Sequence, residues 1–214
     1  MRRITKSKFL ILALVLLWCI GCASNLKTDL KNGDLLFVTA KSSGLSGAIN
    51  EVTKTNEQQQ YDHVGMVELE GFEPFVLHAA PKGGAQRQKL ADFIRDQKNE
   101  GQVVVQYRLK DSNPVMIQDA ILEAKRMLGK PYNFDYILND NSYYCSDFIE
   151  RAFRKYEVFK LEPMTFKDPK TGETNSFWKE FYKKKNLEVP EGELGCNPNG
   201  LAASEKLMKI NILN

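Results

Sequence analysis

Histidine and cysteine are scarce in this chain, and its charges nearly balance. The 214 residues contain two histidines, four cysteines, and 30 Lys and Arg against 27 Asp and Glu. Four of the basic residues lie within the first eight positions, so the rest of the chain is close to neutral. Binding of nucleic acid needs a basic stripe that displaces counterions from phosphates. The sequence has no such stripe, and we expect no nucleic-acid partner.

The N-terminal segment contains an apolar run that is too short to span a membrane. Phe9–Ile20 carries no charge, but its length falls short of the roughly 20 residues that a transmembrane helix needs. A basic stretch followed by such a run is typical of a secretory signal. The next residues, Cys19-Ile20-Gly21-Cys22, resemble the lipobox of bacterial lipoproteins.

This resemblance implies a lipid at Cys22 after removal of a signal peptide over residues 1–21. Residues 22–31 would then form a tether, and the protein would be a lipoprotein of the cell envelope, anchored to the membrane through its N-terminal lipid. Cleavage of a plain signal peptide nearby is the alternative. With Cys22 lipidated, Cys145 and Cys196 are the two thiols left, and in an oxidising compartment they could pair.

The order of apolar runs predicts an α+β domain with an antiparallel sheet. Strands are expected at 35–38, 63–69, 74–79 and 102–109, and helices at 45–52, 88–97, 115–128, 144–156 and 176–185. Residues 70–73 are typical of a hairpin turn, and the chain after Lys160 looks rich in loops. Its length suits one domain. We expect a core over 32–160, a C-terminal extension over 161–214 packed on it, and a monomer.

The two histidines and one of the cysteines could carry chemistry together. His63 and His78 lie on the two strands of the expected hairpin, and Cys145 lies at the start of an expected helix. Free N–H groups and the macrodipole at a helix start favour a thiolate, and an imidazole can take its proton. A half-buried histidine and an inert core cysteine are the ordinary alternatives. Because no further ligand lies at short spacing, we expect neither a metal nor a cofactor.

Several motifs resemble one family of hydrolases. These are "GDLLF", "YDHVGMVE", "VLHAAP", "GKPYNFDY", "YYCSDFIERAF" and the late stretch "EVPEGELGCNPNGLAASEKL". They are similar to the permuted branch of the NlpC superfamily of papain-like cysteine hydrolases, in particular the YiiX/YaeF-type amidases. The resemblance implies a circularly permuted papain-like fold, in which an antiparallel sheet or small barrel packs against helices. The histidine strands then precede the helix that carries the nucleophile at its N-terminus.

The resemblance also implies roles for individual residues. Cys145 matches the nucleophile of a Tyr-Cys-Ser-acidic motif, and His63 matches the base of a His-Val-Gly motif. The third member falls at His78, where many relatives have glutamate. A neutral histidine can accept the hydrogen bond that orients the base. An imidazole with an ordinary pKa would make activity fall below about pH 6.5.

The remaining candidates line or support this centre. Tyr132 matches a family tyrosine, and we expect it to form a substrate pocket with Tyr144, although core packing is an equal alternative. If His78 does not orient the base, Asp62 and Glu68 are the next residues to consider.

The expected reaction is cleavage of an amide or ester through an acyl-thioester intermediate. Cell-wall peptides and lipid-like acyl amides are the expected substrates, and the sequence does not choose between them. Three alternatives stay open: an acyltransferase that uses a lipid acceptor, a binding protein without catalysis, and a structural pairing of Cys145 with Cys196.

Overall fold

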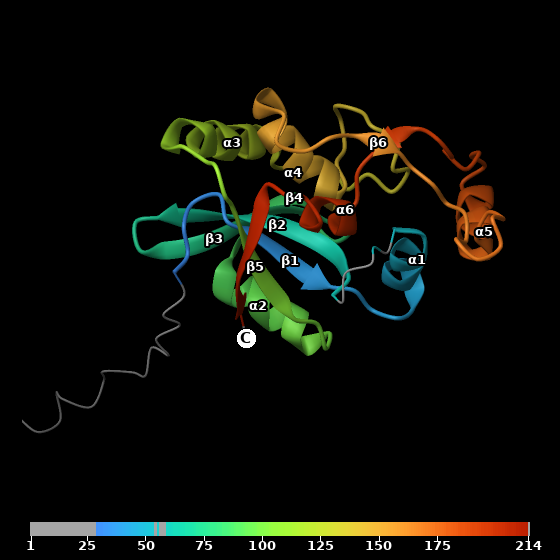
Figure 1. Cartoon of the computed structure of the whole chain (residues 1–214), viewed down its shortest axis with the longest axis horizontal. Coiled ribbons are helices and arrows are strands. Elements are labelled where there is room, and N and C mark those ends of the chain that lie inside the picture. Colours follow the sequence, from blue (N-terminus) through green and yellow to red (C-terminus); the bar gives the residue numbers. More distant parts are fainter. Residues whose placement is uncertain (1–28, 54, 56–58, 214) are drawn as a thin grey trace, which may run out of the picture.

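The computed structural model describes residues 29–53, 55 and 59–213. Its centre is a six-stranded antiparallel sheet in the order β4-β3-β2-β1-β5-β8 (Figure 1). The strands are β1 (Leu35–Thr39), β2 (Tyr61–Glu70), β3 (Glu73–Ala80), β4 (Gly84–Lys89), β5 (Val104–Leu109) and β8 (Leu207–Leu213). A second, two-stranded sheet joins β6 (Glu162–Pro163) to β7 (Leu194–Gly195).

Helices cover both faces of the sheet. Helix α2 (Leu90–Asn99) lies on one face, and helices α3 (Pro114–Met127) and α4 (Cys145–Phe153) lie on the other (Figure 1). The first part of β2 shows how this division arises, because successive side chains of a strand point to opposite faces. Val64 and Met66 pack into the cluster under α3 and α4, whereas Val67 packs with Phe93 of α2.

Local sequence explains where helix α3 begins and ends. Asn113 is its N-cap, with Oδ1 accepting a hydrogen bond of 2.9 Å from the N–H of Met116, and Pro114 occupies the first helical position. Gly129 follows the helix with a φ of +82°, a conformation that glycine adopts without strain. Residues 130–144 beyond it lead to α4.

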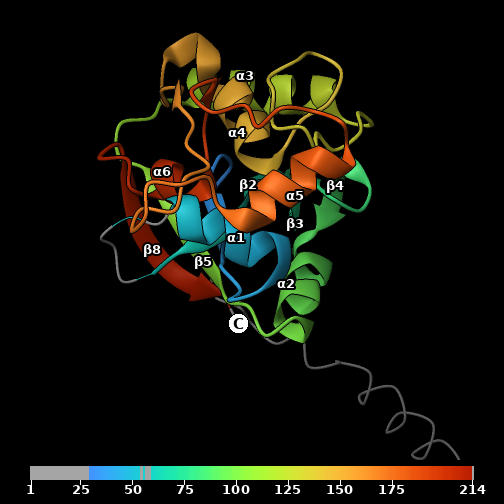
Figure 2. The same ribbon diagram turned by 90° about the vertical axis from the view of Figure 1, so that its right-hand side faces the viewer.

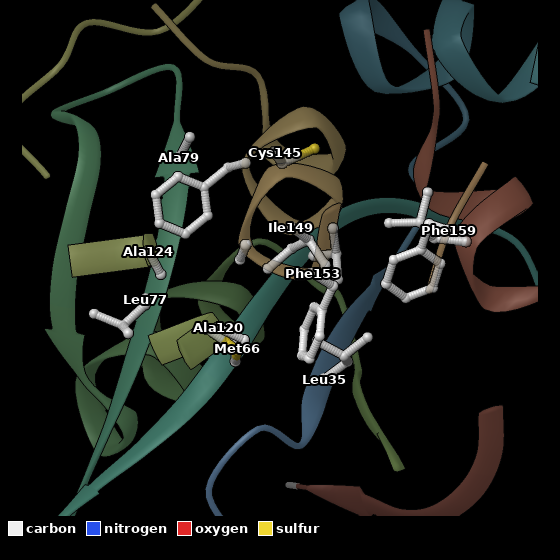
Figure 3. Close-up of a cluster of buried hydrophobic side chains, with 14 of the residues drawn as sticks. Leu35, Met66, Leu77, Ala79, Ala120, Ala124, Cys145, Ile149, Phe153 and Phe159 are labelled. Atoms are coloured by element: carbon white, nitrogen blue, oxygen red, sulfur yellow. The ribbon is translucent and has the colours of Figure 1, made fainter. Parts of the chain in front are cut away.

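Helix α4 is short and almost wholly buried. Its first residue, Cys145, lies at one end of the main core, and Ile149 and Phe153 continue along the helix toward Leu35 (Figure 3). Burying a side chain such as Ile or Phe contributes about 1.5–3 kcal/mol each, so this helix is a fixed part of the core. A 3-10 turn, Arg154–Tyr156, continues it.

The C-terminal part of the chain closes over one end of the sheet. Helices α1 (Gly44–Thr53) and α5 (Ser176–Lys184) lie side by side there (Figure 2). Nε1 of Trp178 donates a hydrogen bond of 3.2 Å to the carbonyl of Ala48, which joins the two helices. Helix α6 (Pro198–Ala202) then leads to β8, which pairs with β5 in the main sheet.

The fold class predicted from the sequence is confirmed: an antiparallel sheet packs against helices, with the cysteine at a helix start. The hairpin between β2 and β3 is also confirmed. Four strands were not predicted: β4 and β8 of the main sheet, and the two short strands β6 and β7. The expectation of loops after Lys160 is therefore wrong at its end, because residues 207–213 form a strand of the main sheet.

The expected signal peptide and Cys22 lie outside the described residues, as does most of the expected tether. Within the described part of the chain, no helix has the length and apolarity needed to cross a membrane.

Candidate active site

Cys145 occupies the first position of α4, and its side chain is 4% exposed. The preceding residue, Tyr144, has an extended backbone and provides no side-chain cap. The N–H groups of a first helical turn have no partner within the helix, and together with the macrodipole they favour negative charge. A nucleophile at this position therefore lies next to donors for an oxyanion.

The sulfur of Cys145 lies against the backbone of β2 on both sides of His63. Sγ is 3.9 Å from the carbonyl oxygen of Asp62, and the N–H of Val64 forms a hydrogen bond that lowers the pKa of the thiol. The ladder between β2 and β3 covers only Met66–Glu70 on β2. The earlier part of β2 is not paired with β3, and the sulfur contacts the strand there.

The two histidines are in direct contact. Nε2 of His63 lies 2.9 Å from Nδ1 of His78, and the rings stand edge to face at an interplanar angle of 79°. Both rings lie against Phe93 of α2, at centroid distances of 6.1 and 5.2 Å. Within the described residues, Nδ1 of His63 forms no hydrogen bond. This nitrogen is therefore free to act as a base.

The thiol and the imidazole of His63 approach β2 from different sides. The cross-strand partner of His63 is Val38, which belongs to the cluster on the α2 face, whereas Cys145 belongs to the cluster on the α4 face. Among the described residues, no hydrogen bond joins Cys145 to either histidine. The structure thus joins His63 to His78 and places the sulfur beside the backbone of His63.

Burial sets the charge of all three groups. It lowers the pKa of His63 to about 3, helped by the charge of His78, and it lowers the pKa of His78 to about 4. Burial and the charge of Asp62 raise the pKa of Cys145 to about 12, although backbone N–H groups oppose this. The resting centre is a neutral thiol with neutral imidazoles, not the thiolate that the helix position alone predicted.

A cavity of about 800 Å³ opens beside the sulfur. Tyr132 and Tyr144, the two predicted pocket residues, both line it, together with Asp62 and Cys145. Much of the remaining wall is apolar or aromatic and includes Tyr136, Val158, Phe159, Met164, Phe166 and Trp178. Neither histidine is among the described lining residues, so the thiol faces the cavity and the imidazoles lie behind the strand.

Asp62 and Glu68, the alternatives to His78 as the residue that orients His63, have other partners. The carboxylate of Glu68 pairs with Arg87 at 2.6 Å and with Lys125. The carboxylate of Asp62 accepts hydrogen bonds from Ser46 and from Gln102, the latter at 3.0 and 3.2 Å. His78 is the one of the three predicted candidates whose side chain contacts His63.

Cys145 and Cys196 are both free thiols that line the same cavity. The segment around Cys196 is held at the start of α4 by two hydrogen bonds. Its carbonyl accepts from Ser146 Oγ at 3.0 Å, and its N–H donates to the hydroxyl of Tyr144 at 3.3 Å. The structural pairing considered from the sequence is therefore not present in this structure.

Sequence reasoning missed several residues of this centre. Tyr136 lines the cavity, and its hydroxyl is buried close to Tyr132. Phe93 covers the histidines from α2. Neither residue has a local signal beyond its aromatic side chain, since its place depends on packing between distant segments. Among residues 29–53, 55 and 59–213, no group of three or more His, Cys, Asp or Glu could hold a metal ion.

Comparison with protein families gives one match that covers most of the chain. Residues 29–211 match the model of the family described as permuted papain-like amidase enzyme, YaeF/YiiX, C92 family. The uncharacterised protein YiiX of Escherichia coli strain K12 is 31% identical over 125 residues. That alignment spans 58% of this chain and 57% of the length of YiiX.

A solved structure supports the fold. The crystal structure of metalloprotein YiiX from Escherichia coli O157:H7 superimposes with a TM-score of 0.69. It is 23% identical, and the match covers 85% of this chain and 96% of that one. At this identity the likeness is one of fold.

Proposed function

Because the chain belongs to the permuted papain-like amidase family (YaeF/YiiX, C92), we propose that it is a cysteine hydrolase acting on amide or ester bonds through Cys145, His63 and His78. One observation carries this assignment. The sulfur of Cys145 lies at a helix start beside the backbone of His63, whose Nε2 is already hydrogen-bonded to His78.

The first step is attack of Cys145 on the substrate carbonyl. His63 lies on the α2 side of β2 at rest, so its ring must move toward the thiol. Nδ1 of His63 then takes the thiol proton as the bond between sulfur and carbon forms. His63 then gives this proton to the departing amine or alcohol as its bond to the acyl carbon breaks, and a thioester remains on Cys145. Since thiol and imidazole are neutral at rest, proton transfer accompanies the attack.

The second step regenerates the thiol. His63 takes a proton from water while the water oxygen attacks the thioester carbonyl, and the sulfur leaves and recovers the proton. The carbonyl oxygen becomes negative in both steps. Backbone N–H groups of Cys145, Ser146 and Val64 lower the pKa of the thiol, and we take them as the donors for that charge.

Between the two substrate classes, the cavity favours an apolar acyl group. Its wall carries many aromatic and aliphatic side chains, and such surfaces bind apolar groups by removing them from water. The charged lining residues Lys160, Glu162, Glu205 and Lys206 could contact a polar head or leaving group. We propose an acyl amide or ester as the substrate, ahead of a cell-wall peptide.

A panel of reporter compounds tests this proposal. Fatty-acyl and dipeptidyl amides and esters of the same fluorescent leaving group are compared on the wild type and on Cys145→Ala. We expect hydrolysis of the acyl compounds that is lost in Cys145→Ala. Preference for the dipeptides would move the assignment to cell-wall peptides. No turnover of any compound, together with binding to the cavity, would support a non-catalytic binding protein.

Transfer of the acyl group to a lipid is the second candidate. The same apolar cavity that would hold the acyl chain could admit an apolar acceptor. Adding a lipid amine or alcohol to the assay distinguishes the two, because a transferase diverts the acyl group into a new amide or ester.

The place of action is also a proposal. The motif at Cys22 supports a lipoprotein anchored to the membrane and located in the cell envelope, with acyl compounds of the envelope as its substrates.

A further inference from the structure

Two polar residues that the mechanism does not use lie behind His78. Gln88 belongs to β4 and pairs with Val76, while His78 pairs with Gln86. Val76 packs on the α2 face, so Gln88 shares that face with His78 as its diagonal neighbour. Nε2 of Gln88 donates a hydrogen bond of 2.7 Å to Oδ2 of Asp96 on α2.

The remaining nitrogen of His78 is in an unusual position. Its Nε2 is buried and has no hydrogen-bond partner of ordinary geometry among the described residues. By the register of β3 and β4, Gln88 is the polar side chain next to His78 on this face, and it raises the pKa of His78 against the larger lowering by burial. Because Nδ1 of His78 already contacts His63, Nε2 is the nitrogen left for Gln88.

The orientation of the Gln88 amide follows from Asp96. A carboxylate only accepts hydrogen bonds, so the amide nitrogen of Gln88 must face it. The amide oxygen is then the atom available to His78, and an oxygen can only accept. Nε2 of His78 therefore carries the proton, and Nδ1 carries the lone pair.

The same logic extends to His63. Because Nδ1 of His78 accepts, Nε2 of His63 must donate across the 2.9 Å contact. A neutral imidazole has one N–H, so Nδ1 of His63 holds a lone pair. With the opposite tautomer of His78, the proton of His63 would lie on Nδ1, and His63 could not accept the thiol proton.

We propose that Gln88, held by Asp96, is a positioning residue that fixes the tautomers of His78 and His63 and so keeps Nδ1 of His63 available as the base. The inference rests on the proposed function for its catalytic meaning, but the tautomers themselves are properties of the resting protein. This relay runs from Asp96 on α2 through Gln88 on β4 and His78 on β3 to His63 on β2, and each of the other three members donates a hydrogen bond toward Asp96.

Long-range ¹H–¹⁵N correlation of the histidine rings at pH 7.5 tests the relay in the absence of substrate. We expect both histidines to carry the proton on Nε2. Gln88→Met keeps the length of the side chain but removes the acceptor, and it should shift His78 to a mixture of tautomers. Asp96→Leu removes the carboxylate that orients the Gln88 amide, and it should also shift His78 to a mixture of tautomers.

Gln86→Met is the matched control. Gln86 lies on β4, like Gln88, and is the direct cross-strand partner of His78. Its amide, however, donates to the carbonyl of Lys82 at 2.8 Å. This variant should leave the tautomers unchanged. A wild-type His78 protonated on Nδ1 would overturn the proposal without any variant. Unchanged tautomers in Gln88→Met, or an equal shift in Gln86→Met, would also overturn it.

Activity gives a second and separate reading. With a reporter ester, kcat of Gln88→Met should fall about 10-fold or more with little change in KM, since the wrong tautomer removes the base but not the pocket. Correct tautomers in a protein that hydrolyses nothing would preserve the relay and refute the proposed function. Full activity with scrambled tautomers would refute the relay.

Discussion

Gly65 lies beside His78 on the neighbouring strand, and its missing side chain leaves the space in which the two histidines meet. A Cβ at Gly65 would lie 2.5 Å from Cγ1 of Val76 and 3.1 Å from Cβ of His78. The first distance is one that real structures do not tolerate without movement. The hydrogen bond between His63 and His78 therefore depends on a glycine two residues after His63.

Gly65→Ala should accordingly damage both stability and activity. Overpacking of a buried site costs about 1–3 kcal/mol, and relief of the clash pushes Val76 or His78 out of place. Urea unfolding and kcat with a reporter ester measure the two effects. Gly200→Ala is the control, because its nearest atom would be 3.6 Å away. A Gly65→Ala protein with wild-type stability and kcat would contradict this role.

The acid limit of activity should lie well below pH 6.5. Burial holds the pKa of His63 at about 3 and that of His78 at about 4, so both stay neutral through the mildly acidic range. We expect kcat/KM to be flat from pH 7 to about pH 5. His78→Glu places a carboxylate beside His63, raises the pKa of the base and moves the limit upward. A wild-type acid limit near pH 6.5 would contradict this, because it would mean that water reaches His63 and His78 and that their pKa values are not lowered.

The free energy of unfolding should also decrease as the pH is lowered, because of these histidines. Between the ordinary histidine pKa of 6.5 and the lower values in the fold, the unfolded chain binds protons that the folded protein does not. Asp147 acts in the opposite direction, since burial raises its pKa to about 6. The comparison of wild type with a His63→Leu, His78→Leu double variant isolates the histidine part.

That comparison uses urea unfolding at pH 7.5 and pH 5.0. The free energy of unfolding should drop more between these pH values in the wild type than in the double variant. An equal drop in both proteins would mean that the histidines titrate normally in the fold.

Lipidation at Cys22 predicts the behaviour of the whole chain in cells. Cys22→Ser should move the protein from the membrane fraction to the soluble fraction. Metabolic labelling with a fatty-acid analogue should mark the wild type and not the variant. A wild-type protein that is freely soluble and unlabelled would contradict the lipoprotein proposal and leave the plain signal peptide as the alternative.

Much of the site could be predicted because its signals are local. The two histidine strands with their hairpin, and the helix that begins at Cys145, follow from apolar periodicity and turn residues. The family motifs indicated the same three residues. What local patterns could not supply was the charge state, because the pKa values of the histidines are lowered by burial and, for His63, also by the charge of His78.

The two missed strands of the main sheet, β4 and β8, have physical reasons. Strand β4 has the polar sequence GAQRQK, and as an edge strand it needs little apolar surface. Strand β8 alternates, but it pairs with β5, about a hundred residues earlier in the chain. The sequence pattern places Gln88 in a helix because β4 lacks apolar alternation. The position of Gln88 beside His78 depends on the register of β3 and β4, which only the structure shows.

The central claim is that Cys145 and His63 act as one unit, and a double-mutant comparison tests it most directly. Residues of a single catalytic unit are strongly non-additive. We predict that Cys145→Ala, His63→Ala and the double variant lose activity to the same residual level, about 100-fold or more below wild type. Cys196→Ser, which alters the other thiol of the cavity, should stay close to wild type. Two modest losses that multiply in the double variant would contradict the account.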